Sequence, residues 1–472
     1  MIKSLFQKFK KVAQPKTIKL GRADHIISRK NISPNALKVL QRLNQAGFEA
    51  YLVGGGVRDL LLELSPKDFD IATSATPNEI KRLFSNCRLI GRRFRLAHIL
   101  FGREVIEVAT FRANHQSDNA ENQHSKTSAT GMLVRDNVYG TVEEDAFRRD
   151  FTINALYYCS KDFTLTDFTG GLADLKNRQL KLIGDPESRY TEDPVRILRA
   201  IRLSTKLNLN IESKTAKPIV KMAHMLTHVS SARLWEEMNK LFLSGYASTI
   251  WKNLLTYKVA NELFPQTTKA LKYDSYDSKT SNIRTTNNNH SVESSSPQDF
   301  SDFIYEALAS TDKRIYQDLP VTPAFLFAVL LWKPLLDSIS FHINKGLKPY
   351  VAYQKASTQV LNDQLALVSI PKRFSSVIRE IWDLQSKLIN QKPRQIYSVL
   401  SHPRFRAAYD FLCLRAGKDK QLSQLANWWT QIQLQDSQGQ ETMIGYLTRQ
   451  STKSNQRRRN YKEKQNKRRF TK

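Results

Sequence analysis

The sequence predicts an α/β domain with a mixed sheet, followed by all-α neck and body domains and a disordered basic tail. Strand-like runs alternate with helical stretches from about Ala36 to Leu182, a pattern typical of α/β domains. After Asp193 the apolar residues follow helical spacing, and few strand signals remain. The segment 451–472 holds ten Lys or Arg residues against one acid, which is too polar a composition to bury a core.

The predicted strands are the runs EAYLV, DFDIAT, VIEVATF and FTINALYY. A polar stretch, 115–131, interrupts the α/β domain and is interpreted as a mobile loop near its site. We expect five regions along the chain: a basic N-terminal extension (1–30), the α/β domain (31–183), a helical neck (184–250), a helical body with a Ser-, Asn- and Thr-rich disordered insertion at 274–298 (251–445), and the basic tail (446–472).

A glycine run marks the first part of a candidate site. Gly54, Gly55 and Gly56 follow an apolar β-prone run and precede a leucine-rich, helix-like segment. Strand, tight turn and helix N-terminus are therefore predicted, and such a turn points backbone N–H groups at phosphates. Arg58, just past the turn, is placed to add a guanidinium to the same phosphates.

Two aspartates one residue apart form the second part. On a strand, Asp68 and Asp70 point to the same face, and two like charges so close repel unless a cation neutralises them. Hard oxygen ligands suit Mg²⁺ or Mn²⁺, and a pair of such ions supports in-line displacement at phosphorus. Either motif alone is common in solvated turns. Their combination within one strand–helix–strand length predicts nucleotide transfer.

Six segments in this order resemble the signatures of the class II tRNA nucleotidyltransferase and bacterial poly(A) polymerase family: GGGVRD, PKDFDIATSATP, EVATFR, EEDAFRRDFTINALYY, DFTGGLADL and RYTEDPVRILRAIR. They cover roughly residues 50–202. The third glycine, the block CRLIGRRFRLAHILFG, the basic tail and the C-terminal PAFLFAVLLWKPLL, SHPRFRAAYDFLCLRA and LANWWTQIQ resemble the poly(A) polymerase branch. The resemblance implies a nucleotidyltransferase head that adds AMP from ATP to RNA 3′ ends, using Mg²⁺ and no nucleic-acid template.

The same resemblance implies roles for individual residues. Asp68 and Asp70 would hold the catalytic metals, and Gly55 with Arg58 would contact the nucleotide phosphates. In RRDFTIN, the residues implied to bind the nucleotide are Arg149, Asp150 and Asn154. Asp150 is also the candidate third catalytic carboxylate, and Glu107 in the apolar run VIEVATF competes with it. Sequence alone leaves that choice open.

The segment EDPVRILRAIR carries the hypothesis for base selection. Asp193, Arg196, Arg199 and Arg202 are spaced by three, which keeps them near one face of a helix. Pro194 marks the helix start and places the two acids before it at the positive end of that helix. A carboxylate and a guanidinium together match the donor and acceptor edge of adenine. The resemblance implies that Asp193 and Arg196 recognise adenine. It also implies that the outer arginines, Arg199 and Arg202, contact phosphates of the nucleotide or the primer. The alternative is a surface helix with charge pairs.

Charge predicts a nucleic-acid partner. The formal net charge is +29, and +20 remains without the net +9 of residues 451–472, so a polyanion should bind with strong salt dependence. Arg88, Arg92, Arg93 and Arg95 either guide primer or triphosphate or form a solvated basic loop. The tail either binds RNA or serves as a solubility tail. Its predicted RNA contacts are Arg457, Arg458, Arg459, Lys467, Arg468 and Arg469.

Compartment and membrane signals are weak. Cys87, Cys159 and Cys413 form no metal or disulfide pattern, so a cytoplasmic protein is expected. The N-terminal residues 1–12 suit either a docking helix or a peripheral membrane contact, and lack the apolar core of a signal peptide. The apolar run 325–332 is too short to span a membrane and predicts a buried helix. Trp428 and Trp429 are more typical of a core than of base stacking.

Two rival functions remain. A CCA-adding enzyme shares every motif of the head, and the third glycine, the tail and the C-terminal segments argue against it. A catalytically idle RNA-binding scaffold is the other, and the intact pair Asp68 and Asp70 argues against it. RNA-degradation proteins or an RNA chaperone are expected partners, with a role in RNA turnover.

Overall fold

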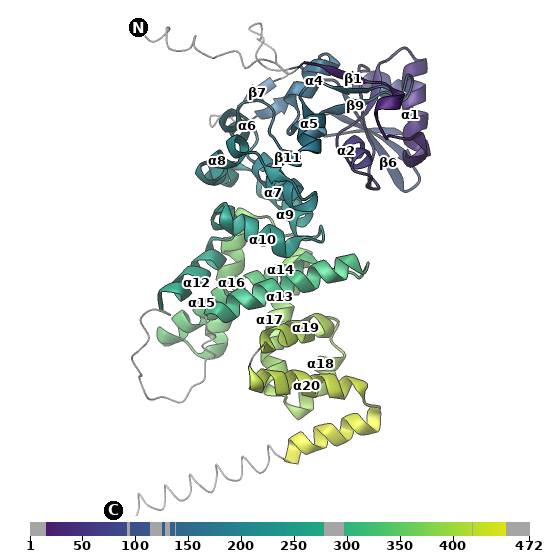
Figure 1. The fold of residues 1–472 in the computed structure, drawn as a ribbon. Coiled ribbons are helices and arrows are strands. Elements are labelled where there is room, and N and C mark those ends of the chain that lie inside the picture. Colours follow the sequence, from purple (N-terminus) through teal and green to yellow (C-terminus); the bar gives the residue numbers. More distant parts are fainter. Residues whose placement is uncertain are drawn as a thin grey trace, which may run out of the picture. The chain divides into compact units, whose positions relative to one another are not determined.

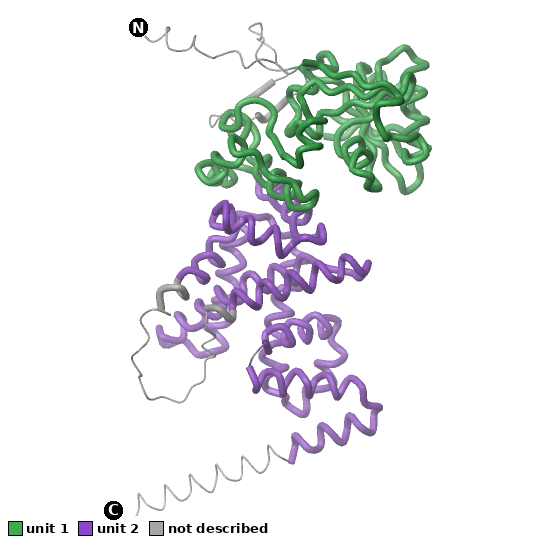
Figure 2. Tube along the Cα trace, viewed as in Figure 1, with its two compact units in different colours: residues 1–229 green, residues 230–472 purple. Residues whose placement is uncertain are grey.

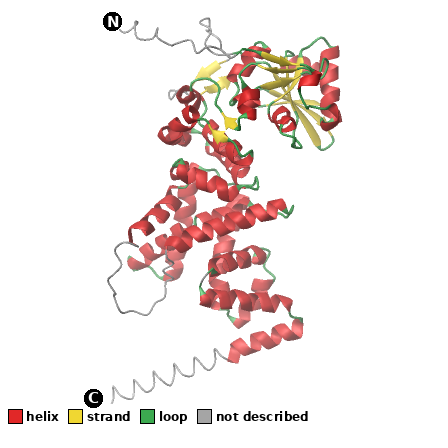
Figure 3. Cartoon of the chain, in the orientation of Figure 1, coloured by secondary structure: helices red, strands yellow, loops and turns green. Residues whose placement is uncertain are grey.

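A computed structural model describes residues 16–91, 95–113, 125–127, 133–136, 138–277, 297–417 and 419–449. The chain divides into two compact units, residues 1–229 and 230–472 (Figure 2). In the described residues, all strands belong to the first unit, and the second unit is helical (Figures 1 and 3). The predicted order of an α/β head and an all-α remainder is confirmed.

The head is built on a mixed sheet. Its eight described strands lie in the order β1-β10-β9-β2-β3-β6-β5-β4, with β3 parallel to β6 and antiparallel to β2. Two further pairs, β11 with β12 and β7 with β8, lie outside this sheet. The strands are β1 (Ile18–Leu20), β2 (Ala50–Val53), β3 (Asp70–Thr73), β4 (Cys87–Ile90), β5 (Leu96–Phe101), β6 (Glu104–Thr110), β7 (Ser125–Thr127), β8 (Leu133–Asp136), β9 (Leu156–Tyr158), β10 (Leu165–Asp167), β11 (Gln179–Leu180) and β12 (Asn210–Ile211).

Helices cover both faces of this sheet. On β3, Ile71 packs into one apolar cluster and Ala72 into another, and neither is exposed to solvent. A strand buried on both faces needs a nearly continuous apolar run, which explains why DIAT lacks the polar alternation of a surface strand. The α-helices of this unit are α1 (Pro34–Gln45), α2 (Gly55–Leu61), α3 (Pro77–Leu83), α4 (Val142–Arg148), α5 (Gly171–Lys176), α6 (Pro186–Glu192), α7 (Val195–Lys206) and α8 (Ser213–Met222).

Several sequence predictions for the head need correction. The FTIN part of the predicted strand FTINALYY is a 3-10 helix, η3 (Thr152–Asn154), and only Leu156–Tyr158 forms a strand. The Asp150 carboxylate accepts a hydrogen bond from the Phe151 N–H at 2.8 Å, and such local side-chain bonds compete with a strand ladder. The polar stretch 115–131 contains the short strand β7, and its other residues lie outside the described part.

The described residues of the basic block after Asn86 form strands that the sequence did not predict. Arg88 lies on β4, which pairs with β5 as an antiparallel hairpin. Cys87 on β4 and Ala97 and Ile99 on β5 are buried in the head core. Buried apolar residues alternate with more exposed residues on these strands. The sequence did not reveal this alternation, because arginines dominate the segment.

The second unit consists of helices. It contains α9 (Ser231–Phe242), α10 (Ala247–Thr256), α11 (Val259–Leu263), α12 (Pro265–Asp277), α13 (Pro297–Tyr316), α14 (Pro323–Leu330), α15 (Trp332–Asn344), α16 (Pro349–Leu367), α17 (Lys372–Asn390), α18 (Ile396–Leu400), α19 (Phe405–Ala416) and α20 (Lys420–Leu434). A further helical stretch covers residues 437–449. The first and last residues of the predicted insertion 274–298 are therefore helical, as are residues 446–449 of the predicted tail.

The apolar run 325–332 is buried, but it is not one helix. It ends α14 and begins α15, which are bent by 46° at Leu331. Among the described residues, no single helix is long and apolar enough to cross a membrane, and this bent pair meets the criteria of length and composition only when its two helices are taken together. Trp429 is fully buried and its indole N–H donates to the Leu388 carbonyl oxygen at 3.0 Å, so the prediction of a core role is confirmed for it.

Candidate active site

The glycine run forms the predicted turn between β2 and α2. Gly54 has φ +72° and ψ −138°, a conformation that side chains other than glycine rarely adopt. A Cβ atom at Gly54 would lie 3.6 Å from Asp70 Oδ2 and 3.7 Å from Arg149 Nη1. At Gly56 it would lie 3.3 Å from the Asp68 carbonyl oxygen. The turn thus lies beside the Asp70 carboxylate, the Arg149 guanidinium and the backbone of Asp68.

Asp70 is the first residue of β3 and lies between Val53 of β2 and Glu107 of β6 in the sheet register. Asp70 is partly buried, and Asp68, just before the strand, is exposed. Within the described part of the chain, neither carboxylate has a hydrogen bond or an ion pair. Burial first, and then the charge of Glu107, raise the pKa of Asp70 to about 6. A negative charge at Asp70 is therefore unfavourable without a cation.

The chemistry of this pair fits a divalent metal ion. Asp68 and Asp70 supply hard oxygen ligands, and no set of three or more His, Cys, Asp or Glu side chains converges on a metal position in the described residues. Mg²⁺ commonly takes one or two carboxylates and completes its shell with water and substrate phosphates. The residues present are sufficient for such an ion once a triphosphate binds.

The two candidates for a third carboxylate differ in position: Glu107 lies beside Asp70 in the sheet register, and its charge raises the Asp70 pKa, whereas Asp150 has its own partners. Glu107 Oε1 lies 3.3 Å from His98 Nε2. The Asp150 carboxylate accepts hydrogen bonds from Arg199 Nε at 2.7 Å and Asn154 Nδ2 at 3.0 Å. Although burial raises the pKa of Asp150, the Arg199 guanidinium and the Asn154 amide outweigh it and hold that pKa below its ordinary range. Asp150 is thus a firmly ionised partner of Arg199.

A chain of side-chain contacts links α2 to α7. Arg58 is buried; its Nη1 donates to Asn154 Oδ1 at 2.6 Å and its Nη2 donates to Asp59 Oδ1 at 2.6 Å. Asn154 in turn donates to Asp150, which pairs with Arg199. Burial lowers the pKa of Lys206 near the end of α7, and Arg58 and Arg202 lower it further. These interactions orient the groups, and their direct contact with a nucleotide stays a prediction.

Two side chains hold Arg149, which, like Asp70, lies beside the Gly54 turn. Its Nη2 donates to Asp145 Oδ2 at 2.9 Å, and its Nε donates to the Tyr157 hydroxyl at 2.8 Å. Tyr157 donates its own proton to Asp145 at 2.7 Å. Sequence reasoning named neither Asp145 nor Tyr157. The i, i+4 spacing of Asp145 and Arg149 is a signal that predicts this ion pair.

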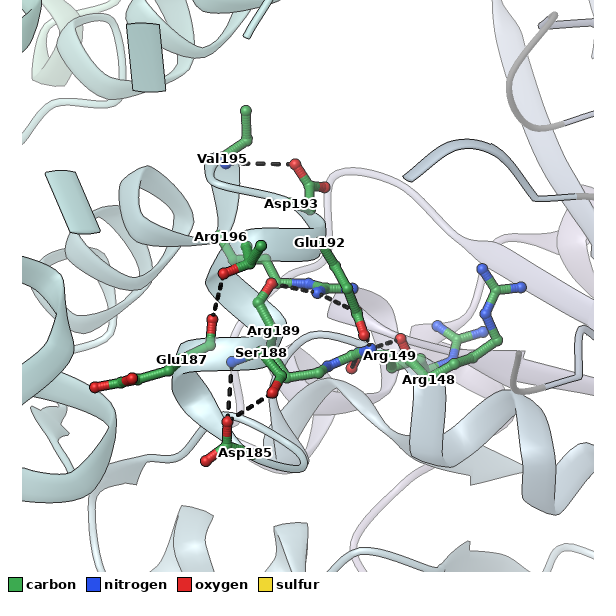
Figure 4. A network of polar contacts seen from close by, with 11 residues as sticks. Arg148, Arg149, Asp185, Glu187, Ser188, Arg189, Glu192, Asp193, Val195 and Arg196 are labelled. Atoms are coloured by element: carbon green, nitrogen blue, oxygen red, sulfur yellow. Dashed lines mark hydrogen bonds and ion pairs between the residues drawn. The ribbon is translucent and has the colours of Figure 1, made fainter. Parts of the chain in front are cut away.

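The EDPVR segment joins two helices, and its two acids differ in role. Glu192 ends α6, and its Oε2 accepts from Arg189 Nη1 at 2.6 Å and Arg196 Nη1 at 3.0 Å (Figure 4). Asp193 Oδ1 instead accepts from the Val195 N–H at 3.3 Å, at the start of α7. The expectation that both acids lie at the positive end of a helix is therefore wrong for Glu192. It lies at the C-terminal end of α6, where two arginines stabilise it.

Arg189 connects this segment to the motif RRDFTIN by hydrogen bonds. It is buried, and its Nη2 donates to the carbonyl oxygens of Arg148 at 2.5 Å and Arg149 at 2.6 Å (Figure 4). Neither Arg189 nor Glu192 was singled out from the sequence. Glu192 follows Arg189 by three residues and precedes Arg196 by four, and these spacings are the signal that predicts such ion pairs.

Arginine side chains crowd this part of the site. Burial first, and then the charges of four neighbouring guanidiniums, lower the pKa of Arg148 to about 8; the four are Arg112, Arg149, Arg189 and Arg196. A guanidinium stays protonated in proteins, so this direction expresses the cost of burying a cation and its repulsion by neighbouring cations rather than loss of a proton. A polyanion such as a triphosphate would relieve it.

Other predicted functional residues lie elsewhere or outside the described part. Arg88 and Arg95 are exposed on and beside the β4–β5 hairpin. Arg92, Arg93, the N-terminal residues 1–12 and the six basic tail positions between 457 and 469 lie outside the part that the structure describes. The three cysteines are free thiols.

Comparison with known proteins decides the family. Residues 50–181 match the family described as "Poly A polymerase head domain", residues 208–271 "Probable RNA and SrmB- binding site of polymerase A", and residues 345–465 "Polymerase A arginine-rich C-terminus". Poly(A) polymerase I of Escherichia coli O157:H7 is 45% identical over 439 residues, 92% of this chain and 90% of the relative. That of Haemophilus influenzae is 43% identical over 89% of this chain and 88% of the relative. The chain belongs to the bacterial poly(A) polymerase I family.

This membership confirms the predicted enzyme class, a polynucleotide adenylyltransferase. The CCA-adding enzyme of Lactobacillus helveticus is a more distant relative, 36% identical over 48% of this chain and 54% of its own length. The solved structure titled "tRNA-processing enzyme (apo form I)" is 20% identical and covers 90% of this chain and 99% of its own, with a TM-score of 0.57. That likeness concerns the fold alone.

The raised pKa of Asp70 predicts that this site lowers the stability of the enzyme. The native state binds the Asp70 proton more tightly than the unfolded state, so this carboxylate lowers the free energy of unfolding as pH rises from about 4 to 6, and the full cost persists above pH 6. Without divalent metal, Asp70→Asn should stabilise the head by about 1–2 kcal/mol at pH 7.5, allowing for partial exposure. Thermal unfolding at pH 7.5 and pH 5 checks this: the gain should shrink at pH 5, and a lower Tm at both pH values would contradict it.

Proposed function

We propose that this protein adds AMP units from ATP to RNA 3′ ends without a nucleic-acid template and releases pyrophosphate. The observation that carries the proposal is the convergence of Asp70, Arg149 and the Gly54 turn, with Asp68 two residues before Asp70. Unneutralised carboxylates beside a fixed guanidinium suit an ATP whose phosphates bring both negative charge and metal ligands.

In this mechanism Asp68 and Asp70 would hold two divalent cations, Mg²⁺ or Mn²⁺. When bound, such ions lower the pKa of the primer 3′-hydroxyl and stabilise the leaving pyrophosphate. The protein's own contribution is fixed positive charge: Arg149 is locked by Asp145 and Tyr157, and Arg199 by Asp150. Groups oriented before the reaction stabilise charge developing in the transition state without reorganising.

Base selection is assigned to the EDPVR segment. We infer that Arg196, oriented by Glu192 and by the Arg189 carbonyl oxygen at 2.6 Å, presents its guanidinium to the adenine ring nitrogen. Asp193, which precedes α7 and takes no part in the Glu192 pairs, is assigned the amino group of adenine. A guanidinium and a carboxylate together match that edge.

The basic tail is assigned to RNA binding, in support of a role in RNA turnover. Removing residues 451–472 should weaken RNA affinity and flatten its salt dependence, by about 0.7 in the logarithmic slope for each RNA phosphate that the shortened chain leaves unneutralised. Equilibrium binding to one RNA oligonucleotide between 50 and 300 mM salt, roughly the range over which counterion release is measurable, tests this. Unchanged affinity at both ends of the range would leave the segment as a solubility tail.

The proposed reaction is tested by giving the full-length protein Mg²⁺ and one labelled nucleoside triphosphate at a time. A plain RNA oligonucleotide and a tRNA lacking its CCA end serve as primers. A long ladder from ATP alone on the plain RNA is expected. Addition that requires CTP, prefers the tRNA and stops after three residues would establish CCA addition instead and overturn the proposal.

A further inference from the structure

The hairpin of α15 and α16 carries aromatic side chains that the helical core does not use. Phe341, near the end of α15, is 54% exposed, and Tyr350 and Val351, in the first turn of α16, are 74% and 49% exposed. Single exposed apolar residues are ordinary. Three exposed apolar residues around one short connection are unusual, and such clusters mark interaction sites. We call residues 341–355 the α15–α16 tip.

The connection that displays these side chains is rigid. Gly346 has φ +86°, and the N–H groups of Gly346 and Leu347 donate to the carbonyl oxygens of Ile343 at 2.8 Å and His342 at 3.1 Å. These bonds close the end of α15 in the way typical of a glycine C-cap. Pro349 then begins α16, a position where its fixed φ favours helix. The aromatic faces are thus held in place before any partner binds.

Along the sequence of the tip the charge has one sign, although Asp383 of α17 accepts a hydrogen bond from the Tyr353 hydroxyl at 2.6 Å. Lys345, Lys348 and Lys355 are all exposed, and no acid occurs between Asp337 and Asp363. Asp337 itself pairs with Lys333. Lys345 Nζ lies 4.2 Å from the centre of the Phe341 ring, a cation–π interaction that places a positive charge beside an aromatic face.

Another exposed aromatic of the same unit shows that these surroundings are not general. Tyr316, at the end of α13, is 92% exposed. It lies in the stretch Asp312–Asp318, which carries an acid at each end. The tip therefore combines exposed rings with lysines and has no acid in its own sequence, whereas Tyr316 offers a ring in a stretch of mixed charge.

We propose that the α15–α16 tip is a stacking platform for single-stranded RNA. Phe341 and Tyr350 stack on bases, and Lys345, Lys348 and Lys355 bind the phosphates between them. Sequence-tolerant binding of single strands combines these two elements, stacking rings and a cationic track. The inference rests on the proposed function, in which RNA is the substrate. It adds a binding surface distinct from residues 208–271 and from the basic tail.

The test compares full-length wild type with Phe341→Ser/Tyr350→Ser and with the matched control Tyr316→Ser, by equilibrium binding to a labelled single-stranded RNA. Because the replaced rings are exposed, Tm should not change in any variant; the two single replacements serve if the double variant fails to fold. The double variant should bind RNA at least about tenfold more weakly, with an unchanged salt slope and unchanged affinity for inorganic polyphosphate. Tyr316→Ser should match wild type.

A second variant, Lys345→Gln/Lys348→Gln/Lys355→Gln, should lower the salt slope and weaken binding of both RNA and polyphosphate. Equal RNA affinity of the aromatic double variant and Tyr316→Ser would overturn the proposal and leave the tip as a surface for another protein. AMP addition by wild type, measured in parallel, separates the two claims. If wild type extends RNA while the aromatic variant binds it normally, only the tip proposal fails; if wild type neither binds nor extends RNA, the proposed function fails as well.

Discussion

Replacing Asp68 or Asp70 by alanine is expected to reduce AMP addition by about 10³-fold or more, while RNA affinity stays within about twofold of wild type. Asp70 lies in the sheet register between Val53 and Glu107 and beside the Gly54 turn. In the described residues, no other pair of carboxylates at this turn is left without hydrogen-bond or ion-pair partners. Losing either one removes one of the two proposed metal ligands.

Single-turnover extension of a labelled RNA by one AMP checks this, with RNA binding measured separately. Asp162→Asn is the matched control, because it removes an exposed acid of the same unit that pairs with Lys19 at 3.7 Å and accepts local hydrogen bonds from Thr164, which an asparagine oxygen can also accept. The control should retain wild-type rates. Residual activity above a few per cent in either Asp68→Ala or Asp70→Ala, roughly beyond what loss of a metal ligand permits, would refute the metal assignment.

The second large effect concerns Asp150. Asp150→Asn and Arg199→Ala should each slow AMP addition by about 10²-fold, and the double variant should be no slower than the worse single variant. Asp150 acts here through Arg199, its partner at 2.7 Å, and residues that work as one unit give non-additive effects. Each single change removes one partner of a buried ion pair, at a cost of about 2 kcal/mol in unfolding free energy because Arg199 is partly exposed.

Two measurements distinguish this positioning role from metal ligation. The Mg²⁺ concentration for half-maximal rate should be unchanged in Asp150→Asn, whereas loss of a ligand would raise it severalfold. Glu187→Ala, which removes an exposed ion pair with Lys221 in the same unit, should leave both rate and Tm unaltered. Additive losses in the double variant together with a higher Mg²⁺ requirement would show that Asp150 is the third metal ligand.

The glycine turn and its helix were predictable because their determinants are local. Gly54 needs a positive φ, and the apolar run before it and the leucines after it determine the strand and the helix. Glu192 was missed because two adjacent acids look alike in sequence. Only the break between α6 and α7 at Pro194 separates an acid that binds two arginines from one that accepts a backbone N–H.

Contacts between residues far apart in the sequence could not be predicted from local sequence patterns. Arg58 and Asn154 are 96 residues apart and share a hydrogen bond, although each was expected to bind the nucleotide directly. Their mutual bond exists because α2 and η3 pack together in the head. Likewise, the β4–β5 hairpin was hidden by its arginines, since the buried alternation of Cys87, Ala97 and Ile99 is revealed only by pairing in the sheet.

The most direct test of the account is to locate the metal ions. Crystals of the enzyme grown with Mn²⁺ and a non-hydrolysable ATP analogue would show anomalous scattering from each ion. We expect peaks about 2.1–2.3 Å from carboxylate oxygens of Asp68 and Asp70, with phosphate oxygens completing the shell and Asp150 still paired with Arg199. Peaks bound to Asp150, or a triphosphate remote from the Gly54 turn, would contradict the account.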